Sequence, residues 1–178
     1  HEKIKSPKEA PSKSVEIANP IVEKAISKAA KKPTGKLTKA DLEKVTRLFL
    51  DSNQLTEVPK GLEKLTQLTS LYLYHNKLTD AKGLEKLTRL KQLDLGDNQL
   101  TDVKGLEKLT RLKQLNLSDN QLTDVKGLEK LTQLERLYLY GNRLTDIKGL
   151  EKHTKLTFLN LKDNPALTKA QIDQLQKA

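Results

Sequence analysis

Aromatic side chains are the first candidates for recognition chemistry in this sequence. The chain holds four Tyr and two Phe, and all of them recur in matching columns of a repeated pattern: Phe49, Tyr72, Tyr74, Tyr138, Tyr140 and Phe158. Tyr offers a large contact area and loses little rotamer entropy when it is held, which suits a binding surface. The alternative is that aromatic residues simply favour strands, but that does not explain why the rest of each repeat lacks them.

Charged and polar residues fill the same columns beside the aromatic ones: His75, Asp94, Asp97, Asn116, Asp119, Arg136 and Lys162. An acidic centre between aromatic anchors favours a ligand that carries Lys or Arg. Asp94, Asp97 and Asp119 have the carboxylates that suit Ca²⁺. Asp is ordinary at these repeat positions, however, so we expect neither a metal ion nor a cofactor.

The residue types that catalysis needs are scarce. The chain has no Cys and three His, and no two of these His have the spacing of metal ligands. Neither a G-x-G-x-x-G motif nor a P-loop is present. His153 replaces the Leu of the preceding repeats, and we expect it to mark a partly exposed coil near the C-terminal end. The sequence therefore predicts a binding protein and not an enzyme.

The element that positions these residues is a repeat of 22 residues, marked by an Asn at the same place in each copy: Asn76, Asn98, Asn120, Asn142 and Asn164. The step from Asn53 to Asn76 is 23, because Pro59 occupies an extra position. Within each copy a Leu pair alternates with variable residues, which predicts a short strand with Leu inward and the variable residues outward. Six such strands are expected, near residues 46–51, 70–74, 92–96, 114–118, 136–140 and 158–162.

The frame L-x-x-L-x-L-x-x-N-x-L fits every copy; one runs from Leu90 to Leu100. It resembles the leucine-rich repeat pattern, and LTDVKGLEKL at this spacing is most similar to the bacterial class that includes internalins. The resemblance implies an α/β fold, a right-handed solenoid with a parallel concave sheet of about six strands. It also implies that the nearly constant LTDVKGLEKL half returns along the convex side as turns and short helical segments. Each repeat Asn is expected to be buried and bonded to backbone groups.

Both ends of the repeat array carry helix signals. Asn19-Pro20 predicts a helix start, Pro33 and Gly35 its end, and Thr38 with Asp41 a second, capped helix. We expect residues 19–45 to form a helical N-terminal cap, residues 46–163 the repeats, and residues 164–178 a C-terminal capping helix over the last coil. Residues 1–18 are rich in Lys, Pro, Ser and Glu, and we expect a basic flexible linker there.

Charge and composition limit the partners and the location. The net charge is +10, and residues 1–36 hold 9 Lys and 4 Glu, so they contribute +5 of it. The Lys columns of the constant half alternate with Glu and Asp, as on a solvated surface, so nucleic-acid binding is not favoured. No apolar run is long enough for a transmembrane helix. The chain has no Met, so we expect His1 to follow processing or trimming.

These observations favour recognition of a protein or peptide on the concave face, by a monomer. The resemblance favours a bacterial protein that is secreted or displayed at the cell surface. A structural or adhesive spacer without a tight ligand is the first alternative. Polyanion binding through the basic tail and the Lys ladders is the second. A recently expanded gene and a consensus-designed scaffold both fit the near-identical repeats.

Overall fold

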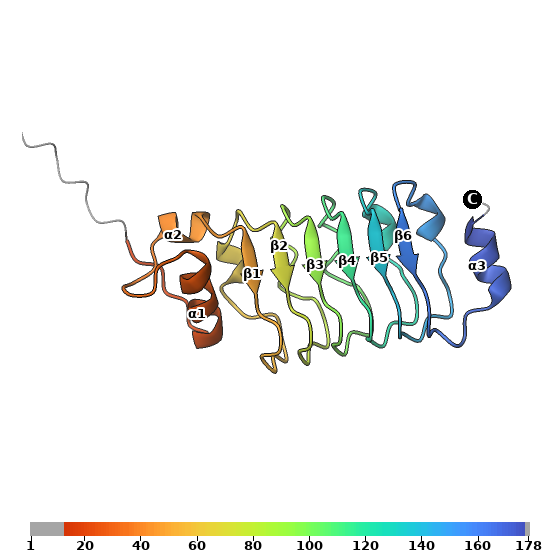
Figure 1. Ribbon diagram of the computed structural model, residues 1–178, viewed down its shortest axis with the longest axis horizontal. Helices are drawn as coiled ribbons and strands as arrows, with labels where there is room; N and C mark the ends of the chain where they lie inside the picture. Colours follow the sequence, from red (N-terminus) through yellow and green to blue (C-terminus); the bar gives the residue numbers. More distant parts are fainter. Residues whose placement is uncertain (1–12, 177–178) are drawn as a thin grey trace, which may run out of the picture.

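The computed structural model describes residues 13–176. Six strands of three residues each form one parallel sheet in chain order: β1 (Arg47–Phe49), β2 (Ser70–Tyr72), β3 (Gln92–Asp94), β4 (Gln114–Asn116), β5 (Arg136–Tyr138) and β6 (Phe158–Asn160). Figure 1 shows them side by side along the solenoid. The register places equivalent residues of successive repeats against each other, for example Leu71 against Leu93. The predicted solenoid with six parallel strands is therefore confirmed.

The strands are shorter than predicted, because the regular sheet ladder ends after three residues. Hydrogen bonds between coils nevertheless continue beyond it. The Leu50 amide donates to the Tyr72 carbonyl at 2.8 Å, and the Ser52 amide donates to the Tyr74 carbonyl at 3.0 Å. The residues just after a strand are therefore also bonded to the next coil, which fixes the backbone that carries the acidic side chains there.

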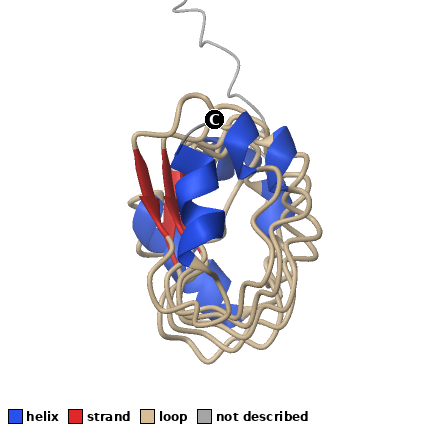
Figure 2. Ribbon diagram, turned by 90° about the vertical axis from the view of Figure 1, so that its right-hand side faces the viewer, coloured by secondary structure: helices blue, strands red, loops and turns tan. Residues whose placement is uncertain are grey.

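Leu fills the interior between the sheet and the returning loops. Figure 2, which looks along the solenoid from its C-terminal end, shows the sheet on one side and the loops on the other. Leu93 of β3 and Leu95, which follows the strand, are almost fully buried, and so are the equivalent Leu pairs of the first five coils. Since each coil buries its Leu against its neighbours, the core is continuous along the repeats.

A buried Asn joins each coil to the preceding one, as predicted. The Nδ2 of Asn98 donates to the carbonyls of Leu73 and Leu95, both at 3.0 Å, and its Oδ1 accepts from the Leu78 amide at 3.0 Å. Asn76, Asn120, Asn142 and Asn164 make equivalent bonds. A buried amide that satisfies backbone groups of two coils stabilises their stacking.

The constant half of the repeat has a structural explanation. The Glu85 carboxylate accepts from the Gly83 amide at 2.7 Å, and Asp80 accepts from the Lys82 amide at 3.0 Å. Gly83 has a φ of +104°, which L side chains rarely adopt. The same contacts recur in later coils, and three of the returning loops form short 3₁₀ helices: η1 (Leu62–Lys64), η2 (Leu128–Lys130) and η3 (Leu150–Lys152).

Two helices precede the first strand: α1 (Pro20–Ala29) and α2 (Lys39–Glu43). Asn19 caps α1, which buries Val22 and Ile26 toward the solenoid end. Thr38 and Asp41 form the predicted reciprocal capping contacts of α2. The hydrogen bond from Lys32 to Asp41, at 2.8 Å, contributes most to lowering the pKa of Asp41 to about 2.

Part of the predicted linker is packed. Residues 1–12 lie outside the described residues, but Ser14 pairs with Thr38 and the Val15 amide donates to the Leu37 carbonyl at 2.7 Å. Ile17 is buried against the loop of the first repeat, near Gly61. The prediction of a flexible linker is therefore wrong for residues 14–17, because Val15 and Ile17 supply apolar contacts that the polar composition around them concealed.

The C-terminal end is less completely covered. Helix α3 (Lys169–Gln176) begins after Thr168, whose hydroxyl accepts from the Gln171 amide at 3.2 Å. Figure 1 shows α3 beyond β6, at the end of the solenoid. Leu156, Leu159 and Leu161 of the last coil are nevertheless only partly buried. The predicted helix is present, but it covers only part of the last coil.

Candidate binding face

The outward side chains of the six strands and of the residues that follow them form one surface, here called the sheet face. It contains all thirteen candidate residues of the sequence analysis. Phe49 is the most exposed aromatic residue at 59%, and Tyr74, Tyr140 and Phe158 are also exposed. Tyr72 and Tyr138 are half-buried by their neighbours. The aromatic side chains therefore lie at the surface and are not part of the Leu core.

Phe49 and Tyr72 form the first aromatic cluster. Their rings stack with centroids 4.7 Å apart and planes 5° from parallel. The Arg47 guanidinium lies 5.6 Å from the centre of the Phe49 ring, and the Tyr72 hydroxyl donates to Oε1 of Gln92 at 3.0 Å. Arg47 was missed in the sequence analysis, although its column also holds Arg136.

Tyr138 and Phe158 form the second aromatic cluster, at the other end of the sheet. Their ring centroids are 5.0 Å apart. The Arg136 guanidinium lies 5.1 Å from the centre of the Phe158 ring, and its Nε donates to the Tyr138 hydroxyl at 3.2 Å. An Arg that is held by aromatic rings keeps its planar hydrogen-bonding edge oriented for a ligand.

A shallow hollow separates the two clusters and is lined by Tyr72, Asp94, Asn116 and Tyr138, among others. The Asp94 carboxylate accepts from Nδ2 of Asn116 at 3.0 Å and from the Gly96 amide at 2.9 Å. Burial raises the pKa of Asp94 above its usual value, and the nearby Asp51 carboxylate adds to this effect. A bound cation here would favour the ionised carboxylate.

The residues after the strands form an acidic edge, which we define by Asp97, Asp119 and Asp163. The pKa of Asp119 is raised by burial and by the charges of Asp97 and Asp163. The Tyr140 pKa is also raised, mainly by Asp163 and then by Asp119. The carboxylates of this edge are thus near enough to affect one another. Asp163 was not among the candidates, although it shares a column with Asp97 and Asp119.

The remaining candidates lie around this edge. His75 forms a close pair with Asp97, and its ring lies 6.1 Å from that of Tyr74. Lys162 is exposed, and its backbone amide donates to Asn160 at 3.1 Å. Within residues 13–176, no three His, Asp or Glu side chains are grouped so that they could hold a metal ion. Asp94, Asp97 and Asp119 thus do not form a calcium cage.

His153 lies away from the sheet face, in the core of the last coil. It is only 6% exposed, whereas Leu156, Leu159 and Leu161 of the same coil are partly exposed, as expected for a coil near the C-terminal end. Within the described part of the chain, neither ring nitrogen has a hydrogen-bond partner. Burial lowers the His153 pKa, and the nearby Leu131 carbonyl and glutamates offset this only in part. The backbone of the repeat therefore keeps its shape with His at a position that holds Leu in the other coils.

Among the described residues, no helix has the length and apolar character needed to cross a membrane.

Comparison with known proteins agrees with this architecture. The sequence matches the family profile described as "Leucine Rich repeats (2 copies)" over residues 43–86, 88–130 and 132–177. No curated protein sequence matches the chain significantly.

Three solved structures show the range of the similarity. An internalin (InlF) of Listeria monocytogenes is 28% identical, with a TM-score of 0.80, and the match covers 89% of this chain and 47% of the internalin. A leucine-rich repeat protein of Leptospira interrogans is 35% identical, with a TM-score of 0.69, over 79% of this chain and 38% of that protein.

The third is the ectodomain of the receptor kinase GASSHO1/SCHENGEN3 from Arabidopsis thaliana, which is 32% identical with a TM-score of 0.59, over 68% of this chain and 16% of the receptor chain. This chain spans about half of the internalin and a smaller part of the other two proteins. The repeat frame, the sheet with its Asn ladder and the profile match over most of the sequence agree: the chain belongs to the leucine-rich repeat family.

Proposed function

We propose that the sheet face binds a protein or peptide ligand. The observation that carries this proposal is the distribution of the aromatic residues. All six stand on outward columns of the strands, and none of the buried core positions uses one. Exposed aromatic side chains in two clusters, about 15 Å apart by the spacing of the strands between them, are the kind of anchors that carry binding energy in protein interfaces.

The charges of the face indicate the chemistry of the ligand. The raised pKa of Asp94 reports a carboxylate that is partly withdrawn from water. A Lys or Arg of the ligand that reached the hollow would compensate this charge. The acidic edge offers further partners for basic side chains.

The comparisons support a binding role at the level of the family. The fold of leucine-rich repeat and internalin-like proteins is normally non-catalytic, and it occurs in receptor ectodomains. The GASSHO1/SCHENGEN3 ectodomain was solved in complex with CASPARIAN STRIP INTEGRITY FACTOR 2. The similarity to the Listeria and Leptospira proteins supports a bacterial origin, and we propose display at the cell surface or secretion on the same ground.

Polyanion binding by the lysine ladders of the loop side is less well supported. Backbone amides lower the pKa of Glu85 and Glu129 most. The charges of Lys108 and Lys86 lower the Glu85 pKa further, and those of Lys152 and Lys130 do the same for Glu129. The ladder lysines are thus accompanied by carboxylates, which weakens their attraction for an anionic polymer.

The test is capture of binding proteins from host and bacterial extracts by the intact chain and by a variant with Tyr72, Tyr74, Tyr138 and Tyr140 replaced by Ala. A control variant carries Lys86→Ala, Lys108→Ala and Lys130→Ala on the loop side. Each captured protein is identified, purified and titrated directly against all three chains. We expect the Tyr variant to bind at least about a hundredfold more weakly, since one interface anchor is worth roughly 2 kcal/mol, and the control to bind normally.

Unchanged affinity of the Tyr variant for a purified partner would overturn the proposal. Failure to capture any partner would favour the spacer alternative. Circular dichroism and thermal melting of each variant show whether a loss of binding reflects loss of the fold. The replaced Tyr side chains lie at the surface, so the variant should fold.

A further inference from the structure

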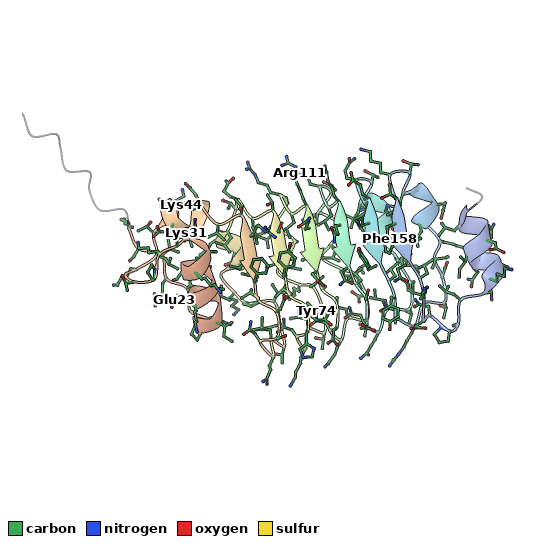
Figure 3. The ribbon with its side chains drawn as sticks, viewed as in Figure 1. Glu23, Lys31, Lys44, Tyr74, Arg111 and Phe158 are labelled. Atoms are coloured by element: carbon green, nitrogen blue, oxygen red, sulfur yellow. The ribbon has the colours of Figure 1, made fainter. Side chains whose placement is uncertain are left out.

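A groove crosses the sheet at the edge where the strands begin, opposite the acidic edge. It extends from β1 to β5 with a volume of about 460 Å³, and its charged lining residues are Arg47, Lys91, Lys113, Glu135 and Arg136. Figure 3 shows Arg111 at this edge of the solenoid and Tyr74 toward the opposite edge. We call this feature the basic groove. The aromatic clusters lie between it and the acidic edge.

The cations of the basic groove are not neutralised by the protein itself. Among residues 13–176 the ion pairs within 4.0 Å are Lys32–Asp41 and His75–Asp97, and neither lies in the groove. Glu135 is the one carboxylate in its lining. Arg89 and Arg111 each precede a groove lysine by two residues in the sequence. Arg89 donates to the neutral Gln67 at 2.6 Å, and Arg111 is exposed.

The loop side of the same molecule provides the contrast. There a column of Glu runs between the Lys columns. Backbone amides lower the pKa of Glu85, Glu129 and Glu151 most, and the neighbouring Lys charges lower it further. The described loop-side lysines form no ion pair within 4.0 Å, but carboxylates accompany them along the whole ladder. A mixed surface of that kind is ordinary on a soluble protein. The basic groove is different, because four of its five charged lining residues are cations.

We propose that the basic groove binds an acidic segment of a polypeptide. The inference rests on the proposed function of the sheet face, since it assigns a second part of the same ligand. Arg47 and Arg136 belong to both features: each lines the groove and lies on an aromatic ring. A carboxylate in the groove can therefore pair with the free edge of an Arg while the ligand also contacts the rings.

The dimensions favour a single extended chain. The groove crosses four strand intervals, or roughly 19 Å, which an extended segment of about six residues spans. A wider anionic polymer that filled the groove would also approach the negative charges beyond it. Asp94 lies three residues after Lys91 in the sequence, about 10 Å along the strand. The ligand expected from this arrangement is acidic toward the groove and basic toward the acidic edge, which also fixes its orientation on the face.

The test uses a fluorescein-labelled octaglutamate peptide, titrated against the full chain by anisotropy at about 50 mM salt, where charge contacts are weakly screened. The groove variant carries Lys91→Gln, Arg111→Gln and Lys113→Gln, and it leaves both aromatic clusters intact. The control variant carries Lys86→Gln, Lys108→Gln and Lys130→Gln on the loop side. Both variants lose the same charge and keep the same basic N-terminal residues, so they differ only in where the charge is removed.

We expect the groove variant to bind the peptide at least about tenfold more weakly, because it removes three exposed cations whose weak pairings add up, and the control to change by less than about twofold. Equal losses in both variants would show that the peptide senses only net charge, and no loss in the groove variant would remove the site. Either result overturns the inference. Melting curves of both variants confirm that they are folded.

A heparin titration at the same salt distinguishes an acidic peptide from a broad polyanion. If heparin bound more tightly than the peptide and lost more affinity in the groove variant, the ligand class would be a polyanion and the proposal would be wrong. Failure of the groove is separable from failure of the sheet face. The groove is tested by the Lys and Arg variant with a defined peptide, whereas the face is tested by the Tyr variant with a captured partner.

Discussion

His153 shows how one residue can depart from its repeat while the backbone does not. Its position corresponds to Leu87, Leu109 and Leu131, all buried in the core. The imidazole takes the same place with both ring nitrogens buried and, among the described residues, without a hydrogen-bond partner. A buried polar group without a partner costs roughly 1–3 kcal/mol. The last repeat is therefore less stable than its predecessors at this point.

Replacing His153 with Leu should stabilise the domain by about 1–2 kcal/mol at neutral pH, because it removes the unpaired polar atoms. The gain should grow as the pH falls. Since burial lowers the pKa of His153 in the folded state, the unfolded chain takes up the proton first, near its ordinary pKa of about 6.5. Stability of the unchanged chain is then lost as the pH falls through this value.

Urea unfolding of both chains between about pH 8 and pH 5 measures this difference, over the range around the ordinary His pKa. The other two His of the sequence, His1 and His75, are present in both chains, so the comparison isolates position 153. A His153→Leu chain with the same stability profile as the original would show that the ring nitrogens are solvated after all.

The acidic edge shows the limit of sequence reasoning at the same scale. Asp97, Asp119 and Asp163 have φ angles of 50–54°, in the left-handed region. Asp tolerates this backbone better than most residues. Ser52 and His75 share the conformation, and Gly141 occupies the same column. The recurrence of Asp therefore has a backbone cause in addition to the proposed ligand role. The sequence alone could not tell the backbone cause from the ligand role, because Asp at this position is compatible with both.

Among the elements, the repeat coils were predictable and their ends were not. Leu and Asn recur in every coil and occupy the same environment each time. One sequence pattern therefore predicts the strands, the Leu core and the buried Asn residues together. Val15 and Ile17 belong to no repeat, and their packing depends on a surface that only the folded solenoid provides. The partial cover of Leu156 and Leu161 by α3 has the same cause. The two aromatic clusters were predictable as columns, but the Arg side chains over their rings required coordinates.

The Asn ladder makes neighbouring coils depend on each other. In Asn98→Ala the Leu78 amide loses its acceptor, and the carbonyls of Leu73 and Leu95 each lose one of two amide donors. We expect a loss of about 2 kcal/mol or more from the unfolding free energy. Asn53 is the matched control, because it occupies the same position in the first coil. Its described side-chain bond is a single donation to the Asp51 carbonyl at 3.1 Å.

Asn53→Ala should therefore cost less than about 1 kcal/mol, the usual contribution of one exposed hydrogen bond. Denaturant unfolding monitored by circular dichroism gives both values under the same conditions. Equal losses in the two variants would mean that the local backbone preference of Asn, and not its hydrogen bonds to the neighbouring coil, determines the loss of stability.

At the scale of the whole molecule, the loop side is nearly constant from coil to coil, whereas the outward residues of the sheet side vary. On the loop side, Asp and Glu accept from backbone amides and compensate the Lys columns. This requirement repeats in every coil, so the sequence there hardly varies. On the sheet side outward residues accept from backbone amides in some coils only, as Asp94 and Asn116 do, whereas Tyr takes the same column in others. The two edges of the sheet side carry opposite charge, with Lys91 six residues before Asp97 and Lys113 six residues before Asp119, and the variation of the sequence is concentrated between them. A surface that differs along the solenoid can distinguish one ligand and its orientation.

The two ends of the solenoid should differ in local stability. At the N-terminal end α1 and Ile17 cover the core, and Leu37 and Leu42 are buried with them. At the C-terminal end the Leu residues of the last coil are partly exposed, and the described contacts of α3 with earlier coils include a hydrogen bond from Gln171 to the Thr145 carbonyl at 3.0 Å. In a repeat protein each coil depends on its neighbours, so opening should begin where cover is weakest.

Amide hydrogen exchange under native conditions measures this gradient. The amides of Gln114 in β4 and Phe158 in β6 make equivalent bonds to the preceding coil, at 3.0 and 3.1 Å, so their geometry is matched. We expect the Phe158 amide to exchange at least about tenfold faster, which corresponds to roughly 1.4 kcal/mol less local stability. The amides of β1 should be protected more nearly like those of β4. Fastest exchange in β1, or equal protection of all six strands, would contradict this view. The first result would show that the helices at the N-terminal end cover the core poorly, and the second that the solenoid opens as a single cooperative unit.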